Sequence, residues 1–130
     1  MVEFVIVTNN PLVREGYEDR IEIDFIDAYG YFEVLDRIRR LVHKGWVLET
    51  HPLSGSVKPN ETPYKTAIVS KRPEHSPLDF NSLQISESAI ETYQKLASVK
   101  QLPRWGERTL ADFRMVDKSL IDSAVSQMRI

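Results

Sequence analysis

The sequence contains no cysteine, and this absence excludes a large part of protein chemistry. Disulfide bonds, thiolate nucleophiles, zinc fingers and iron–sulfur clusters all require cysteine. The three histidines also lack the His-x-x-x-His spacing of a helical zinc site. We therefore expect no redox thiol, no metal centre and no cofactor.

An excess of charge of one sign is missing as well. Seventeen lysines and arginines against 19 aspartates and glutamates leave a net charge of -2, whereas proteins that bind nucleic acid through its phosphates normally carry a basic excess. No apolar run approaches the roughly 20 residues of a membrane helix, and the first residues lack the pattern of a secretory signal. We expect a cytoplasmic protein without a nucleic-acid or membrane partner.

What is present is the composition of an ordinary globular chain, with 42% hydrophobic residues in 130. This length predicts a single α/β domain over residues 1–130. Apolar patterns, together with cap and turn residues, predict strands over 2–8, 20–26, 46–50 and 64–70, and helices over 11–17, 31–44, 86–99 and from 109 to the end. This order favours a small three-layer sandwich, with a mostly parallel sheet of about four strands and a long C-terminal helix. An α+β fold with mixed strand directions is the alternative.

Two segments carry the candidate site. Asn9 and Asn10 follow the first strand, and a loop of about a dozen residues without periodicity follows the third. If these two strands are parallel, both segments lie at the carboxyl edge of the sheet, where α/β proteins bind ligands. In the loop, Ser54-Gly55-Ser56 could turn its backbone N–H groups towards an anion, and Lys58 or Lys65 could add positive charge. The predicted ligand-binding residues are Asn9, Asn10, His51, Ser54, Gly55, Ser56, Lys58, Asn60, Tyr64 and Lys65.

Each of these residues also has a purely structural interpretation. Asn10 before Pro11 is typical of a helix cap, and a Ser-Gly-Ser turn is common in ordinary loops. His51 could act as a general base with Ser54 or Ser56 as nucleophile, but the sequence does not show that these side chains meet. No phosphate-binding G-x-x-x-x-G-K-[ST] sequence is present.

The run Thr8-Asn9-Asn10-Pro11-Leu12-Val13, the helix end His43-Lys44-Gly45 and the run from His51 to Lys65 resemble the GrdX-like family. These are small accessory proteins encoded in the glycine reductase gene clusters of anaerobic bacteria. The resemblance covers about the first 70 residues, and it carries no established biochemical activity.

The resemblance implies an accessory protein of anaerobic glycine, sarcosine or betaine reductase metabolism, and its characteristic runs coincide with the candidate site. Together with the residues, it favours a binding protein for a small anionic or amino-acid-like ligand. A hydrolase-like or transferase-like enzyme using His51 with Ser54 or Ser56 is one alternative. A subunit that docks on a reductase subunit through the C-terminal helix, or that forms a homodimer, is another.

Overall fold

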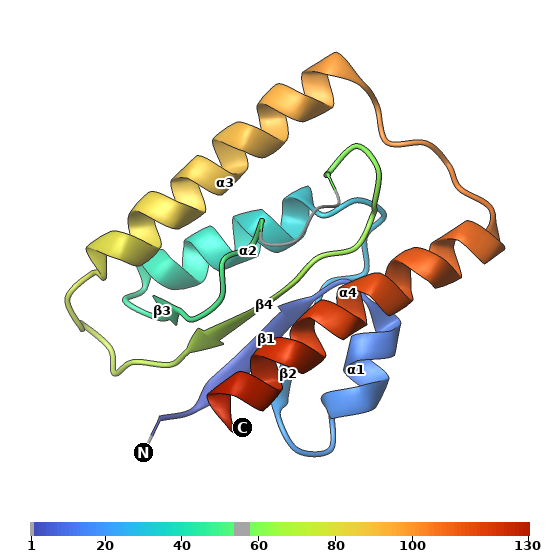
Figure 1. Cartoon of the computed structure of the whole chain (residues 1–130). Coiled ribbons are helices and arrows are strands. Elements are labelled where there is room, and N and C mark those ends of the chain that lie inside the picture. The colour runs from blue at the N-terminus through green and yellow to red at the C-terminus, as the bar shows by residue number, and fades with distance from the viewer. Residues whose placement is uncertain (1, 54–57) are drawn as a thin grey trace.

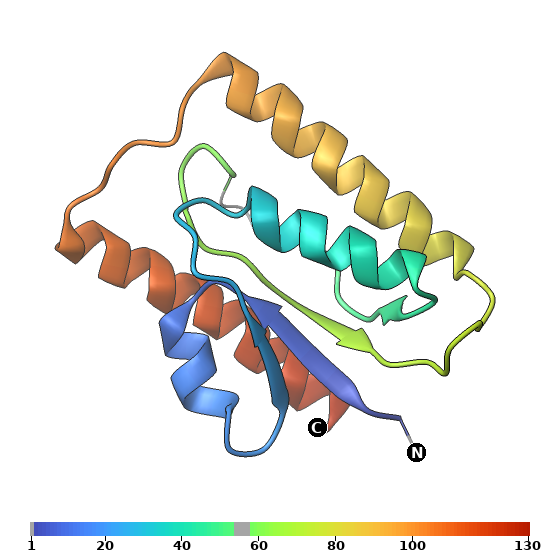
Figure 2. The ribbon, with the colours of Figure 1, turned by 180° about the vertical axis from the view of Figure 1, so that it is seen from behind.

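The chain forms a four-stranded sheet with helices on both faces (Figures 1 and 2). The computed structural model describes residues 2–53 and 58–130. Within these residues, no helix is long and apolar enough to cross a membrane. The elements in chain order are β1 (Phe4–Thr8), α1 (Pro11–Tyr17), β2 (Glu22–Phe25), α2 (Phe32–His43), β3 (Val47–Leu48), β4 (Thr66–Ser70), α3 (Phe80–Val99) and α4 (Glu107–Met128).

The sheet is mixed, so the prediction of a mostly parallel sheet is wrong. Its strand order is β2-β1-β4-β3; β1 is parallel to β2 and antiparallel to β4, and β4 is antiparallel to β3. A parallel connection needs a crossover, usually a helix. The described residues between β3 and β4 include no helix, and the chain turns back there. As a result, β4 runs between β3 and β1 in the opposite direction.

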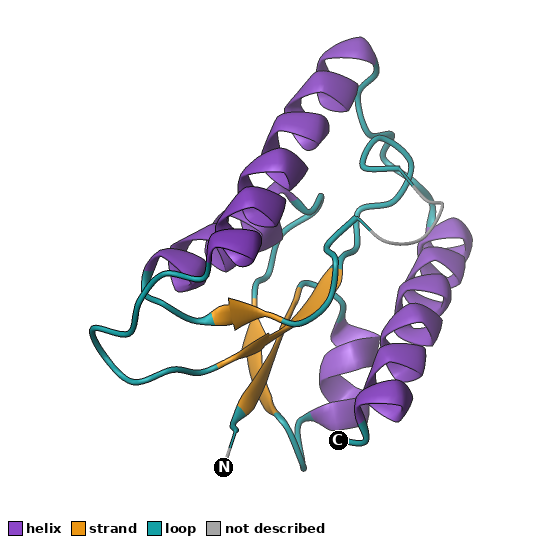
Figure 3. Cartoon of the chain, turned by 60° about the vertical axis from the view of Figure 1, so that its left-hand side comes forward, coloured by secondary structure: helices purple, strands orange, loops and turns teal. Residues whose placement is uncertain are grey.

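The elements form three layers, as the sequence predicts. Figure 3 shows α2 and α3 on one face of the sheet and α1 and α4 on the other. Side chains of β1 alternate between the faces, as expected for a strand. Val5 and Val7 join the core under α2 and α3, which also contains Ile38, while Ile6 joins the core under α1 and α4 with Ile121.

The helix ends show where local sequence signals suffice. α1 begins as predicted, with the Asn10 side chain accepting from the Leu12 N–H and Pro11 in the first turn. α3 begins at Phe80 rather than at residue 86, because the Asp79 carboxylate accepts from the Ser82 N–H and caps the helix. α4 begins at Glu107 after Gly106, so the predicted start at residue 109 is wrong.

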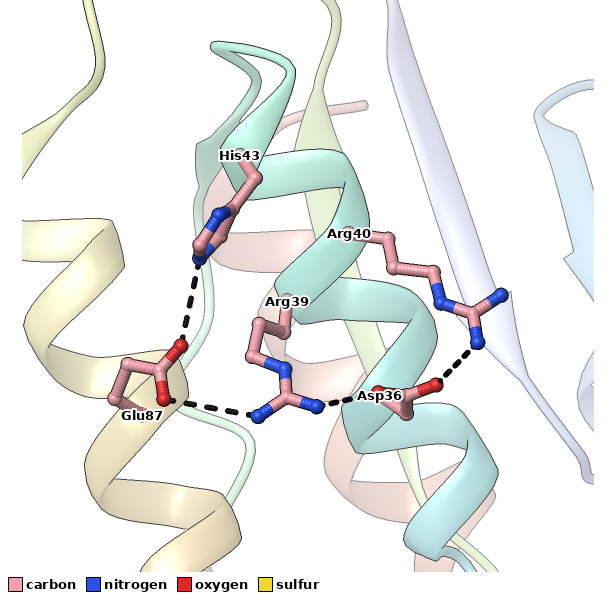
Figure 4. Close-up of polar contacts among 5 residues, drawn as sticks. All are labelled: Asp36, Arg39, Arg40, His43 and Glu87. Atoms are coloured by element: carbon pink, nitrogen blue, oxygen red, sulfur yellow. Dashed lines mark hydrogen bonds and ion pairs between the residues drawn. The ribbon is translucent and has the colours of Figure 1, made fainter.

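A chain of polar contacts joins α2 to α3 on the outer side (Figure 4). The Arg39 guanidinium lies 2.8 Å from an Asp36 oxygen on its own helix and 3.7 Å from a Glu87 oxygen on α3. His43 Nε2 lies 3.4 Å from the other Glu87 oxygen. Glu87 is half exposed, and exposed ion pairs of this kind stabilise a fold only weakly. The buried apolar side chains therefore hold α3 in place.

Candidate functional site at the strand ends

Three strands end at the same edge of the sheet. β1 and β2 are parallel, and β3 has the same direction because both it and β1 are antiparallel to β4. We call this edge the strand-end rim and define it as residues 9–11, 26–31, 51–53 and 58–66. Figures 1 and 2 show the segment before β4 beside the segment between β2 and α2. Parts of the chain that are far apart in sequence therefore meet where the sequence predicted a ligand site.

Asn9 joins three of these segments. Its Nδ2 lies 2.7 Å from the Pro63 carbonyl oxygen, 3.1 Å from that of Gly30 and 3.2 Å from that of Ala28. Its Oδ1 accepts from the Lys65 backbone N–H at 2.9 Å. Because all four partners belong to the backbone, the buried Asn9 amide acts as a cross-link that fixes the shape of the rim.

Asn10 has a different set of partners. Its oxygen caps α1, while its Nδ2 donates to the Arg114 carbonyl oxygen and to Asp117 Oδ2, each at 3.0 Å. Asp117 Oδ2 also accepts from the Thr66 hydroxyl at 2.6 Å, and that hydroxyl lies 2.7 Å from the Thr8 hydroxyl. This buried polar cluster connects β1, β4 and α4.

Asp117 is only 6% exposed. Burial raises its pKa, and the hydrogen bonds from Thr66 and Asn10, together with the charge of Lys65, act in the opposite direction. Two hollows of about 10 and 30 Å³ adjoin Asp117 under α4. Each has the size of one or two water molecules rather than of a larger ligand. This side of the rim is therefore built mainly for structure.

Lys65 lies next to this cluster but points to the other face of the sheet. It directly precedes Thr66, and neighbouring residues of an extended chain face opposite sides. Its Nζ lies 5.2 Å from the centre of the Tyr31 ring, which belongs to the core under α2 and α3. Lys65 is only 5% exposed, and its ammonium has no hydrogen-bond or ion-pair partner among the described residues. Burial lowers its pKa, although the charge of Asp117 raises it in part.

Tyr31 adds a second unsatisfied group to the same place. The residue is fully buried, and its hydroxyl has no hydrogen-bond partner in residues 2–53 and 58–130. Burial raises the pKa of Tyr31, so the hydroxyl keeps its proton at ordinary pH and remains a donor. Buried polar groups without a partner are rare in proteins and mark places that call for an explanation.

The predicted loop residues have mixed outcomes. Ser54, Gly55 and Ser56 lie outside the described residues. Leu53, just before them, packs against the core that contains Tyr31, so the loop starts on the Lys65 side of the sheet. Lys58 is exposed, and its backbone N–H donates to Glu61 at 3.1 Å.

Two further residues of the prediction serve mainly to hold the rim together. Asn60 is buried and donates to the Leu96 carbonyl oxygen of α3 at 3.3 Å. The Tyr64 hydroxyl accepts from Arg114 of α4 at 2.9 Å. Each of these side chains has a hydrogen-bond partner among the described residues, unlike the Lys65 ammonium and the Tyr31 hydroxyl.

Among the described residues, no carboxylate orients His51, and its proposed partners Ser54 and Ser56 lie outside them. His51 is exposed, and its Nδ1 accepts from the Leu53 N–H at 3.1 Å. The two carboxylates that could orient it have other partners: Glu49 accepts from the Ser70 hydroxyl at 2.6 Å, and Glu61 accepts from the Lys58 N–H. Among the residues that the structure describes, no group of His, Asp and Glu side chains is arranged to hold a metal ion.

The sequence reasoning missed Tyr31 and Asp117. A signal for Asp117 was present, because residues 113, 117, 121 and 125 recur at intervals of four on the inner face of the last helix. A carboxylate at such a core position is rarely found without a polar partner. Tyr31 gave no comparable signal, since a tyrosine at a helix start is unremarkable.

Comparison with known protein families shows which family the chain belongs to. A family model described as GrdX-like protein matches residues 5–126. The chain belongs to the GrdX-like family. The match continues far beyond the first 70 or so residues that carry the resemblance in sequence, and it includes Asp117 and most of α4. At a coarse level, membership of the GrdX-like family fits an accessory role in glycine reductase gene clusters. Comparisons with curated proteins and with solved structures gave no significant match.

Proposed function

We propose that this GrdX-like protein is a non-catalytic accessory protein of glycine, sarcosine or betaine reductase metabolism that holds a small anion, such as a carboxylate or phosphate, at the strand-end rim. The observation that carries the proposal is Lys65, a buried residue whose ammonium lies over the Tyr31 ring and forms no hydrogen bond or ion pair with the described residues. A charge in such a place is costly without an ionic partner. An anion beside the ammonium would offset that cost and return the pKa of Lys65 towards its ordinary value.

The Tyr31 hydroxyl supports the same proposal. It is a second donor without a described partner in the same core, and an anion accepts hydrogen bonds from ammonium and hydroxyl groups alike. The predicted anion nest of Ser54, Gly55 and Ser56 remains part of the proposal. It is supported by Leu53, which leads into that segment from the Lys65 side.

Thermal unfolding with and without anions tests the proposal. Acetate and phosphate, at ionic strength matched with sodium chloride, should raise the melting temperature of the wild type, because a ligand at 100 times its Kd stabilises by about 2.7 kcal/mol. Lys65→Met keeps the length and apolar stem of the side chain but removes the charge, and it should abolish the shift. Lys58→Met is the matched control at an exposed lysine and should retain it. A wild type that responds to neither anion, or a shift that survives Lys65→Met, would contradict the proposal.

One observation favours a second function, docking on another protein through α4. Met115, Val116 and Leu120 belong to the apolar pattern of the C-terminal helix, yet all three are exposed. Exposed apolar side chains that lie together on a helix are typical of protein contacts. Sedimentation of the purified protein alone and with a reductase subunit tests this proposal. The complex should form with the wild type and weaken when Val116 and Leu120 are replaced by serine.

A further inference from the structure

A separate cleft opens on the α1 side of the strand-end rim. It has a volume of about 340 Å³, and its lining includes Asn9, Arg14, Phe25, Asp27, Tyr29 and Tyr64. This volume lies within the range of small-molecule pockets, roughly 300–1,000 Å³, and far exceeds the hollows beside Asp117. The cleft lies where parallel β1 and β2 end, and Lys65 is not among the residues that line it.

Two opposite charges line this cleft, and neither is committed elsewhere in the part of the chain that the structure describes. The guanidinium of Arg14 lies 4.1 Å from the centre of the Phe25 ring. Stacking fixes the plane of a guanidinium and leaves its N–H groups at the edge free to donate. Neither Arg14 nor Asp27 forms a side-chain hydrogen bond or ion pair within residues 2–53 and 58–130.

The remaining wall is largely aromatic, and hydrogen bonds hold its two tyrosines. The Tyr29 hydroxyl donates to the Pro103 carbonyl oxygen at 2.5 Å and accepts from the Trp105 backbone N–H at 3.0 Å. The Tyr64 ring is held by the hydrogen bond from Arg114. With Phe25, these rings line the same cleft as the Arg14 guanidinium and the Asp27 carboxylate. Such preorganisation favours binding, because few groups have to be immobilised when a ligand arrives.

We propose that this cleft binds a small zwitterion of the amino-acid type that carries an apolar or aromatic group. Arg14 receives the carboxylate of the ligand through its N–H edge, and Asp27 receives the ammonium group. The rings of Phe25, Tyr29 and Tyr64 contact the apolar group. A simple anion would leave Asp27 unpaired, and a simple amine would leave Arg14 unpaired.

Isothermal titration calorimetry with phenylalanine as the probe tests this inference. Three analogues each remove one feature: phenylpropionate lacks the ammonium group, phenethylamine lacks the carboxylate, and glycine lacks the ring. Phenylalanine should bind at least about tenfold more tightly than any of them. No measurable binding, or equal affinity for phenylalanine and an analogue, would overturn the inference.

Variants separate the two charges. Arg14→Gln should weaken phenylalanine and phenylpropionate but not phenethylamine, and Asp27→Asn should weaken phenylalanine and phenethylamine but not phenylpropionate. Arg40→Gln and Asp19→Asn are controls at exposed positions away from the cleft and should change nothing.

Lys65→Met distinguishes this site from the proposed anion site. Phenylalanine binding should survive the substitution, whereas the acetate and phosphate response should not. Loss of phenylalanine binding in Lys65→Met, or its retention in both Arg14→Gln and Asp27→Asn, would overturn the assignment to this cleft.

Discussion

Asn9 and Asn10 are adjacent, yet their side chains do different things. The sequence could identify Asn10 as a cap, because Asn before Pro at a helix start is a local signal. It could not identify the partners of Asn9, since the Gly30 and Pro63 carbonyl groups are 21 and 54 residues away along the chain. A polar side chain that a local pattern suggests for ligand binding can therefore serve instead to hold distant backbone segments together.

The cross-link at Asn9 leads to the first prediction. Asn9→Ala removes the only described hydrogen-bond donor to the Pro63 carbonyl oxygen. It therefore leaves buried backbone groups unpaired. Each such group costs about 1–3 kcal/mol, so the variant should lose at least about 2 kcal/mol of unfolding free energy in urea. Asn81→Ala, at an exposed position of α3, should stay within about 0.5 kcal/mol. Equal effects of the two substitutions would contradict the structural role of Asn9.

Asp117 provides a prediction about pH. Burial raises the pKa of Asp117 above its ordinary value of 3.8. At pH values just above 3.8, the native protein therefore keeps a proton on Asp117 that the unfolded chain has released. The contribution of Asp117 to stability therefore falls as pH rises through this range. Asp117→Asn removes the titration and keeps an oxygen that can accept from Thr66.

The measurement is the unfolding free energy of wild type and Asp117→Asn between pH 4 and pH 7. Relative to the variant, the wild type should lose stability as pH increases. Asp112→Asn, at an exposed position of the same helix, should follow the wild type over this range of pH. A wild type that gains stability relative to Asp117→Asn over this range would show that its pKa is lowered instead.

At the scale of elements, the sequence predicts existence better than direction. Apolar patterns and cap residues located the helices and strands found in residues 2–53 and 58–130, and β2 lies at one edge of the sheet. The predicted direction of β4 was wrong. This direction depends on how the long connection after β3 turns, and composition does not encode that turn. The start of α3 was missed because its first turns carry little apolar periodicity, although Asp79 marks the cap.

The attachment of α3 can be tested by comparing two residues of that helix. Ile90 is buried in the core under α2 and α3, and Glu87 takes part in the polar contacts with Arg39 and His43 (Figure 4). Ile90→Ala should cost about 2–5 kcal/mol because it leaves a cavity. Glu87→Gln should cost less than about 1 kcal/mol. If chemical denaturation shows the larger loss for Glu87→Gln, polar contacts hold the helix instead.

For the molecule as a whole, the location of the candidate site was easier to predict than its members. β1 and β3 point in the same direction, which brings the Asn9 segment and the start of the long loop to one rim, as the sequence suggested. The end of the loop reaches the same rim because β4 is antiparallel to both strands. The approach of Asp117 to Asn10 spans 107 residues and depends on how α4 packs across the sheet. Tyr31 and Arg14 became candidates only through the burial and stacking that the fold creates.

The proposed function depends on the charge of Lys65, and nuclear magnetic resonance can follow that charge directly. The protein is labelled with carbon-13 at the lysine ε position, and Lys65→Arg identifies the resonance. Without an anion, the signal should titrate below the ordinary value of 10.5, because burial lowers the pKa of Lys65. Saturating acetate or phosphate should raise the midpoint. A Lys65 resonance that titrates at its ordinary value, and that neither anion shifts, would contradict the account.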